Sequence, residues 1–371
     1  MTSELFSTPA IELRPSSTPK STEEREALKA VGGFGQIFTD NMVTIRYTEG
    51  RGWHDAVLEP YGPVSLDPAA SVLHYGQEIF EGLKAFKAAD GQIVSFRPDA
   101  NAARFNRSAA RMAMPELPED LFLAAIDALV SIDREWVPEG EGRSLYLRPF
   151  MFATQVGLGV NSPSAEYLFM LIAGPAGSYF AGGVKPVTVW LSEDYVRAVK
   201  GGTGEAKCGG NYAASFLAQA QAVEQGCDQV VWLDGFEHKY VEEMGSNNLY
   251  FVYGEGENAR LMTPALTGSL LPGITRDSLL KVAADLGIPA EEGTISVEQW
   301  RQGVGGGEIT EVFGCGTAAV VTPLGKVKSK DGEFAIGHGE PGPVTLRIRE
   351  ALLDIQTGKA ADLHHWLRKI A

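Results

Sequence analysis

The glycine-rich stretch from Lys200 to Tyr212 constrains the fold of this chain more than any other segment. It reads KGGTGEAKCGGNY and surrounds Lys207 with five glycines in thirteen residues. Glycine accepts positive φ and lets backbone approach a ligand closely, so the stretch predicts a tight loop. Lysine forms Schiff bases with carbonyl groups when its pKa is lowered. Lys207 is therefore a candidate nucleophile, although the segment alone also fits a flexible surface turn with a solvated lysine.

Two other glycine motifs are excluded by their neighbours. A phosphate-binding P-loop requires G-x-x-x-x-G-K-[ST], but Lys207 follows Ala206 and precedes Cys208. The stretch from Gly314 to Ala319 has the form G-x-G-x-x-A of a dinucleotide-binding turn. It is followed by β-branched residues and Pro323 instead of the long helix that the dinucleotide fold requires. We therefore expect a turn between two strands at this position.

The composition is that of an ordinary globular protein with small partners. A length of 371 residues suggests about two domains, and 44% hydrophobic with 21% charged residues is typical of such chains. The net charge of −15 opposes binding to nucleic acids or anionic membranes, and no basic patch offsets it. We find no membrane span and no apolar core of a signal peptide. A soluble cytoplasmic protein that acts on small molecules is expected.

The cysteines predict neither a disulfide framework nor a metal site. Cys208, Cys227 and Cys315 form an odd and sparse set without C-x-x-C spacing. This usage fits a reducing compartment. We expect no bound metal.

Changes in composition divide the chain into four parts. Residues 1–32 are rich in Ser, Thr, Pro and charge, and predict a mobile arm with a short helix over residues 22–30. Short strands and two helices then indicate a small first domain over residues 33–173. Residues 174–186 hold four glycines and two prolines and are interpreted as an interdomain linker. A larger second domain, residues 187–371, would carry the cofactor.

Hydrophobic periodicity predicts the elements within these domains. Strands are expected at 42–47, 55–60, 64–66, 93–96, 144–149, 167–173, 187–191, 228–233, 238–243, 248–253 and 260–263. Helices are expected at 99–113, 118–136, 211–225, 275–286, 297–302 and 342–357.

Six motifs occur in order between about residues 34 and 358. They are HYGQEIFEGLKAF, SLYLRP, KGGTGEAKCGGNY, VEEMGSNNLYF, LPGITRDSLL and EVFGCGTAAVVTP. Together they resemble the branched-chain amino acid aminotransferases, class IV aminotransferases of pyridoxal-phosphate fold type IV. The resemblance implies a two-domain α+β fold like that of D-amino-acid aminotransferase. A smaller N-terminal α/β sandwich domain and a larger C-terminal pseudo-barrel domain are expected, in a homodimer that uses pyridoxal 5'-phosphate.

The same resemblance assigns the cofactor contacts. Lys207 would carry the internal aldimine and then act as the base that moves a proton between substrate Cα and cofactor C4′. Glu243 would pair with the pyridine nitrogen, whereas Glu242 is interpreted as an exposed charged edge. Tyr212 would bind the phenolic oxygen, and the helix start at Ile274 would bind phosphate. The further expected cofactor residues are Arg104, which ends the pattern R-P-x-x-N-x-x-R, and Ser246, Leu271, Thr275 and Thr317.

The substrate pocket is also assigned by resemblance. Aromatic side chains would surround a branched aliphatic side chain, and Arg148 with the Tyr75 hydroxyl would pair with the distal carboxylate of glutamate. Ser246 and Ala318 would lie near the substrate carboxylate, and Leu158 and Val160 would come from the partner subunit. The full set is Phe34, Tyr75, Phe80, Tyr146, Arg148, Leu158, Val160, Tyr179 and Ala318.

The implied activity is reversible amino transfer from L-leucine, L-isoleucine or L-valine to 2-oxoglutarate, giving 2-oxo acids and L-glutamate. D-amino-acid aminotransferases and aminodeoxychorismate lyases share the fold but are usually shorter. An amino-acid-binding module without catalysis would not need Lys207, Glu243 and Arg104 together. Some members carry a redox C-x-x-C after the last glycine turn. Residues 319–322 read AVVT, so no such switch is expected, and Cys208 is interpreted as buried and inert.

Overall fold

The computed structural model describes residues 9–177 and 183–370, which form two compact units. The first contains residues 9–177, 206–209 and 356–370; the second contains 183–205 and 210–355. The sequence predicted one domain over residues 187–371, whereas the turn around Lys207 and the C-terminal segment group with the first unit. The predicted linker begins inside a strand, and its residues 178–182 lie outside the described part.

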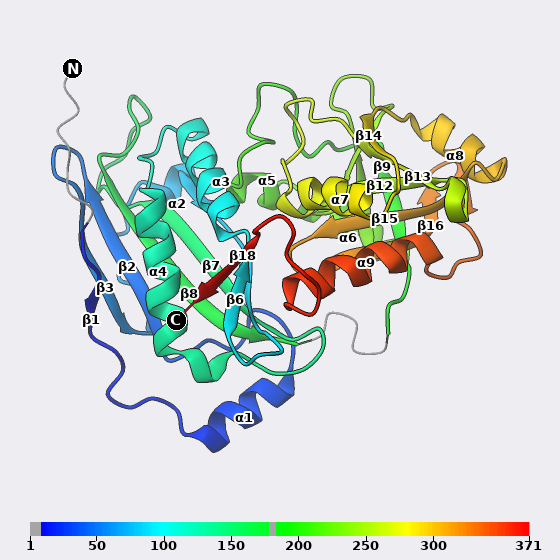
Figure 1. Ribbon diagram of the computed structural model, residues 1–371. Helices are drawn as coiled ribbons and strands as arrows, with labels where there is room; N and C mark the ends of the chain where they lie inside the picture. The colour runs from blue at the N-terminus through cyan, green and yellow to red at the C-terminus, as the bar shows by residue number, and fades with distance from the viewer. Residues whose placement is uncertain (1–8, 178–182, 371) are drawn as a thin grey trace. The chain divides into compact units, whose positions relative to one another are not determined.

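A nine-stranded sheet forms the first unit (Figure 1), with the order β1-β3-β2-β8-β7-β5-β6-β18 and β4 paired to β7. Neighbouring strands are antiparallel except for the parallel pair β1 and β3. The strands are β1 Glu12–Leu13, β2 Asn41–Thr48, β3 Gly52–Pro60, β4 Glu78–Phe80, β5 Leu83–Lys87, β6 Ile93–Phe96, β7 Ser144–Ala153, β8 Glu166–Ala176 and β18 Leu367–Ile370.

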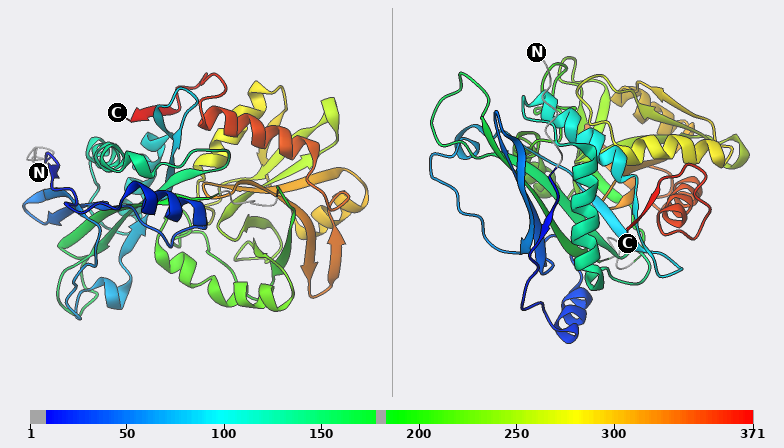
Figure 2. Two further views of the ribbon diagram at one scale, coloured as in Figure 1. Left: turned by 90° about the horizontal axis from the view of Figure 1, so that it is seen from below. Right: turned by 60° about the vertical axis from the view of Figure 1, so that its left-hand side comes forward.

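Helices α3 (Pro98–Arg111) and α4 (Glu119–Ile132) lie against one face of this sheet (Figure 2). Their buried faces meet the sheet through aromatic packing: the rings of Phe105 and Phe169 are 5.7 Å apart between centroids and nearly perpendicular. Such edge-to-face contacts add to the apolar burial that holds helix and sheet together. The remaining helices of the unit are α1 Thr22–Val31, α2 Val72–Tyr75 and the 3-10 turn η1 Arg134–Trp136.

The N-terminal segment is packed on the first unit from residue 12 onward, where the sequence predicted a mobile arm. Strand β1 pairs with the edge strand β3, and the ammonium of Lys20 lies 3.1 Å from a carboxylate oxygen of Asp40. The predicted helix is confirmed as α1, which begins with a capping box between Ser21 and Glu24. Residues 1–8 lie outside the described part.

The second unit is built on a closed ring of six strands. The order β11-β10-β9-β16-β15-β12 is completed by pairing of β12 with β11, which confirms the expected pseudo-barrel. Buried side chains fill its interior, among them Val189, Leu249 and Phe251. The strands are β9 Val187–Ser192, β10 Gln229–Leu233, β11 Val241–Met244, β12 Asn247–Tyr253, β15 Ile309–Gly316 and β16 Val320–Ser329, with β13 Arg260–Pro264, β14 Ala290–Gly293 and β17 Gly332–Ala335 extending the sheet.

Helices cover this ring from outside. They are α5 Gly209–Ala213, α6 Phe216–Glu224, α7 Ile274–Asp285, α8 Val297–Gly305 and α9 Pro343–Gln356, with the 3-10 turn η2 Gly256–Asn258. The turn expected after Gly316 is confirmed, since β15 and β16 are antiparallel neighbours joined there. No helix of the described residues has the length and apolarity needed to cross a membrane.

Four predicted elements differ from the structure because local contacts override periodicity. Residues 64–66 form no strand, since Pro63 and Pro68 flank them. The helix predicted at 211–225 breaks where the hydroxyl of Ser215 donates to the Tyr212 carbonyl, 2.6 Å away. The helix predicted at 118–136 ends at Ile132, before η1.

The fourth difference is the strand predicted from residue 238, which begins at Val241. A turn precedes it, because the Asp234 carboxylate accepts the backbone N–H groups of Phe236, Glu237, Lys239 and Tyr240 at 2.7–3.1 Å. Burial alone would raise the pKa of Asp234, but these four hydrogen bonds lower it to about 2.

Candidate active site

Lys207 is half-buried and held by two elements of the first unit. Its backbone N–H donates to the hydroxyl of Ser108 on α3 at 3.0 Å, and its carbonyl accepts the N–H of Phe80 at 2.9 Å. Its Nζ lies 4.7 Å from the centroid of the Phe80 ring. Two residues further on, the N–H of Gly209 donates to the carboxylate of Glu78 on β4. The glycine-rich loop is therefore fixed on both sides of the lysine.

Arg104 forms a fully buried ion pair with Glu81. Its Nε and Nη2 donate to the two carboxylate oxygens at 2.7 and 2.9 Å, and the amide of Asn101 donates to the same carboxylate at 2.7 Å. Burial alone would raise the pKa of Glu81. The charge and hydrogen bonds of Arg104, with Lys207 and Asn101, lower the pKa below its ordinary value instead. The arginine expected to bind phosphate is thus oriented by an acid of the FEG turn.

Four of the expected substrate residues gather around Lys207. The rings of Phe34 and Tyr146 are 4.7 Å apart, and the guanidinium of Arg148 lies 4.7 Å from the Phe80 ring and 5.4 Å from that of Tyr146. Arg148 Nη2 donates to the Tyr146 hydroxyl at 3.1 Å, whereas its Nε is buried without a hydrogen-bond partner. A buried guanidinium with an unsatisfied N–H suits an incoming carboxylate.

Tyr75 does not join this cluster. Its hydroxyl accepts the N–H of Gly159 at 2.9 Å, and within the described residues no contact links it to Arg148. Tyr75, Leu158 and Val160 instead line a second cavity of about 580 Å³. Leu158 and Val160 are 70% and 76% exposed, as side chains offered to a partner would be. Tyr179, expected in the substrate pocket, lies outside the described residues.

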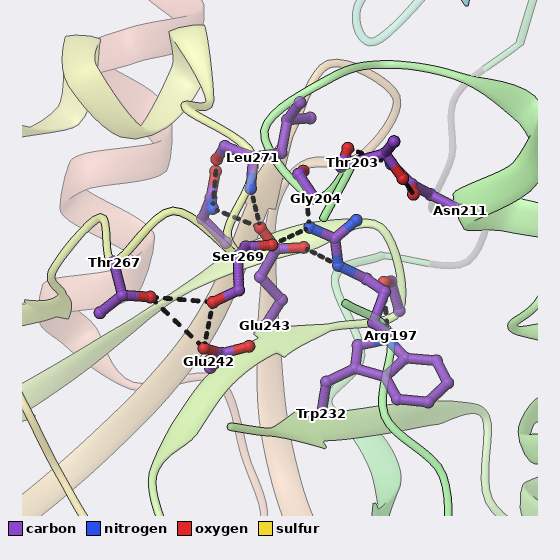
Figure 3. A network of polar contacts seen from close by, with 12 residues as sticks. Arg197, Thr203, Gly204, Asn211, Trp232, Glu242, Glu243, Thr267, Ser269 and Leu271 are labelled. Carbon is purple, nitrogen blue, oxygen red and sulfur yellow. Dashed lines mark hydrogen bonds and ion pairs between the residues drawn. The ribbon is translucent and has the colours of Figure 1, made fainter. Parts of the chain in front are cut away.

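In the second unit, Glu243 is buried among nitrogen donors (Figure 3). Arg197 Nε lies 2.9 Å from its Oε2, and the N–H of Leu271 donates to Oε1 at 2.6 Å. The amide of Asn248 donates to Oε1 at 3.3 Å and to the Leu271 carbonyl at 3.0 Å. Arg197 also donates to the carbonyls of Gly204 and Ser269, at 3.0 and 2.8 Å. This arrangement keeps an ionised carboxylate at a fixed position.

The expected phosphate-binding groups of the second unit come from a helix start and a hairpin. Helix α7 begins at Ile274 after Gly273, which provides no side-chain cap for the first-turn N–H groups. Thr275 is buried in this turn, and Thr317 and the exposed Ala318 form the tip between β15 and β16. The other two assigned residues are Ser246, exposed between β11 and β12, and Tyr212, half-buried in α5.

Glu242 is buried, and its interpretation as an exposed charged edge was wrong. It is only 6% exposed and meets the hydroxyls of Ser269 and Thr267, the second at 3.4 Å (Figure 3). Neighbouring residues of a strand point to opposite faces, and both faces of β11 are covered, so neither acid of the pair reaches solvent.

Sequence reasoning missed Glu81 and Arg197 as site residues. The partner of Glu81 is 23 residues away on another element, and Arg197 reaches Glu243 across 46 positions, so no local pattern marks either pair. The available signals were their positions, in the FEG turn before β5 and just upstream of the glycine-rich loop. Among the described residues, no group of three or more His, Cys, Asp and Glu side chains gathers as a metal site.

The comparisons with known proteins place the chain in a family. The family model for class IV amino-transferases matches residues 78–327. The probable branched-chain-amino-acid aminotransferase of Streptomyces coelicolor is 60% identical over 367 residues, covering 99% of this chain and 100% of that protein. The chain belongs to the branched-chain-amino-acid aminotransferases of class IV.

Solved structures agree with this aminotransferase family. The branched-chain amino acid aminotransferase of Escherichia coli matches with a TM-score of 0.72 and 30% identity, over 88% of this chain and 99% of that one. A second branched-chain amino acid aminotransferase, from T.th., was solved complexed with N-(5'-phosphopyridoxyl)-L-glutamate. It matches with a TM-score of 0.70 and 30% identity, over 88% of this chain and 98% of that one. The expected type IV fold is thereby confirmed.

The side chains of this aminotransferase fit the chemistry of pyridoxal 5'-phosphate. Lys207 provides a half-buried primary amine, and Glu243 provides a buried carboxylate suited to a protonated ring nitrogen. The guanidinium of Arg104, the first-turn N–H groups of α7 and the hydroxyls of Thr275 and Thr317 are the donors that a phosphate prefers. Each unit contributes part of this donor set.

Proposed function

We propose that this aminotransferase transfers the amino group of L-leucine, L-isoleucine or L-valine to 2-oxoglutarate, reversibly, with pyridoxal 5'-phosphate as cofactor. The observation that carries the proposal is the Phe80 ring, which has the Lys207 amine at 4.7 Å and the Arg148 guanidinium at 4.7 Å. A nucleophilic amine and a carboxylate-binding cation thus share one apolar surface. The names of the relatives support the choice of substrates.

The residues of the chain have distinct tasks in this proposal. The bound cofactor would supply an electron sink for bond changes at the substrate Cα. The Lys207 amine would hold the cofactor and move the proton at Cα. Glu243, ionised by its contact with Arg197, would keep a ring N–H protonated. The remaining cofactor contacts would come from Tyr212, Ser246, Leu271, Ile274, Thr275, Thr317 and Arg104.

Substrate choice would depend on the cluster of Phe34, Phe80, Tyr146 and Arg148. The aromatic surfaces favour branched aliphatic side chains, because each well-placed methylene contributes roughly 1–3 kcal/mol to discrimination. The buried Nε of Arg148 would pair with the distal carboxylate of glutamate or 2-oxoglutarate. Tyr75, Tyr179 and Ala318 are proposed as further pocket residues, and Ser246 would lie near the substrate carboxylate.

The proposed assembly is a homodimer in the cytoplasm. Exposed Leu158 and Val160 support a contact with a second copy, which would complete the substrate pocket. The three cysteines are free and buried, as suits a reducing compartment.

The test is single-turnover kinetics of the two half-reactions with reconstituted protein. L-Leucine should exceed L-alanine by large factors in kcat/KM, and Lys207→Ala should abolish both half-reactions. Lys185→Ala, a change of an exposed lysine in the same unit as the ring strands, is the matched control and should behave as wild type. Faster turnover of D-alanine than of L-leucine would assign the protein to a different activity of the same fold. No turnover with intact cofactor binding would favour an amino-acid-binding module.

The same assay tests Arg148 as the distal carboxylate partner. Arg148→Met should slow the half-reaction with L-glutamate far more than the one with L-leucine, because only glutamate brings a second carboxylate that would be left unpaired. Equal losses in both half-reactions would contradict the assigned role.

A further inference from the structure

A cavity of about 380 Å³ opens in the second unit, and it shares no residue with the proposed cofactor or substrate contacts. Its walls come from the loop after β9, the turn between β10 and β11, and the segment after β13. Most of this lining is apolar, with side chains such as Val199, Phe236 and Tyr240. The volume and the mixture of apolar walls with few polar groups are those of a small-molecule site.

Glu242 brings a carboxylate to this cavity. The hydroxyls of Ser269 and Thr267 both converge on its Oε1 and also lie 2.8 Å from each other. In the described part of the chain no hydrogen bond ends on Oε2. One oxygen is thus oriented by the protein, while the other offers its lone pairs to a different donor.

The other charged groups that line the cavity do not replace that donor. The Asp234 carboxylate is engaged by four backbone N–H groups of its own turn. Lys200 is the cation among the lining residues and is exposed. Burial raises the pKa of Glu242 and the charge of Asp234 raises it further, whereas the hydroxyls and the charge of Arg197 act to lower it. An arriving cation would relieve this unfavourable charging of the carboxylate.

We propose that this cavity binds a small organic cation, a protonated amine with an apolar body, whose N–H pairs with Glu242 Oε2 and whose body packs on Val199, Phe236 and Tyr240, and that its binding alters Glu243. The walls exclude a strongly polar ligand, and the acid selects positive charge.

Ser269 provides the physical connection to Glu243 (Figure 3). Its hydroxyl donates to Glu242, and its carbonyl accepts Arg197 Nη2 at 2.8 Å. The same guanidinium lies 2.9 Å from Glu243 Oε2. A shift of Ser269 when Glu242 pairs with a cation therefore changes the position or strength of the Arg197–Glu243 contact. The functional consequence rests on the proposed role of Glu243 beside the cofactor, whereas the binding site does not.

The test of the site is calorimetry of the holoenzyme with N,N-dimethyl-3-methylbutylamine, a tertiary amine that cannot form a Schiff base. We expect saturable binding that is at least about tenfold weaker in Glu242→Gln and strengthens as the pH rises from acidic to neutral. Glu237→Gln, an exposed acid of the adjacent turn, is the matched control and should bind as wild type. The uncharged 3-methylbutan-1-ol should bind more weakly than the amine. Equal affinity of wild type and Glu242→Gln for the amine, or no saturable binding to wild type, would overturn the proposal.

A second variant separates loss of the site from misfolding. Val199 is 46% exposed, so Val199→Trp should fold normally, fill the cavity and abolish amine binding while Glu242 keeps its charge. The coupling is read from the half-reaction with L-leucine: the amine should change its rate in wild type and leave it unchanged in Val199→Trp. Binding without a rate change in wild type would refute the coupling to Glu243. Absence of transamination with normal amine binding would instead refute the proposed function.

Discussion

At the residue scale, the first unit depends on one buried charge pair. Glu81 is fully buried and Arg104 is 4% exposed, and two parallel N–H···O bonds join them. Removing one partner of such a pair leaves an uncompensated charge in an apolar environment, whereas removing both does not. Because the same carboxylate also feels the charge of Lys207, the pair belongs to both the stability of the unit and the electrostatics of the site.

We expect Glu81→Gln and Arg104→Met each to lower the free energy of unfolding by about 3–5 kcal/mol. The lowered pKa of Glu81 means that its stabilising contribution is present above the unfolded pKa near 4.5 and is lost as the pH falls through the lower folded pKa. Wild type should therefore lose stability below about pH 4.5 more steeply than Glu81→Gln. Urea unfolding of the cofactor-free protein across this range measures both effects.

The control for this pair is the double variant Glu81→Met with Arg104→Met. It should be less destabilised than either single change, since no unpaired charge remains. Additive losses in the double variant would show that the two side chains do not act as a pair.

At the scale of elements, the junction between β12 and α7 orders the site of the second unit. Gly273 precedes the helix with an ordinary φ of −68°, but a Cβ there would overlap the Asn248 side-chain oxygen. Asn248 in turn holds the Leu271 carbonyl and Glu243. A single position thus places both the helix start and the buried acid, so glycine is required for close approach rather than for an unusual φ.

Gly273→Ala should displace Asn248, lower the free energy of unfolding by about 1–3 kcal/mol and weaken cofactor retention. Gly305→Ala in α8 is the matched control: a Cβ there meets nothing within 4 Å, and alanine is the better helix former, so stability should stay equal or rise by up to about 1 kcal/mol. Thermal unfolding and equilibrium dialysis of the cofactor measure the two effects. Normal cofactor binding by a destabilised Gly273→Ala would show that Asn248 has only a structural role.

At the scale of the whole molecule, the exposed apolar side chains indicate a surface that a second copy covers. Leu158 and Val160 lie close together in sequence on the first unit and border the cavity that Tyr75 lines. Large side chains of this kind carry little benefit in water, and closed two-fold pairs are the commonest assembly of soluble oligomers.

Light scattering should therefore give a particle of about twice the 39.8 kDa chain. Leu158→Asp combined with Val160→Asp should shift it toward monomer and reduce activity together with the assembly. Leu363→Asp, at a site that is equally 70% exposed, should leave the dimer intact. A fully active monomeric wild type would contradict the proposed dimer.

The sequence by itself determined the family, the type IV fold and the loop around Lys207. These features depend on local chemistry: glycines that permit tight backbone, periodic apolar residues and ordered motifs that survive in the letters. The strands of the closed ring and the turn after Gly316 were predicted for the same reason. Their roles in binding the cofactor and substrate stay predictions.

Only the tertiary structure decided which polar groups meet. It paired Glu81 with Arg104 and Arg197 with Glu243, buried Glu242 against Ser269, and separated Tyr75 from Arg148. It also packed the N-terminal segment onto the sheet edge and returned β18 to the first unit. Partners in such pairs lie tens to hundreds of residues apart, so the chain must fold before either side chain has a neighbour, and no local pattern in the sequence records the contact.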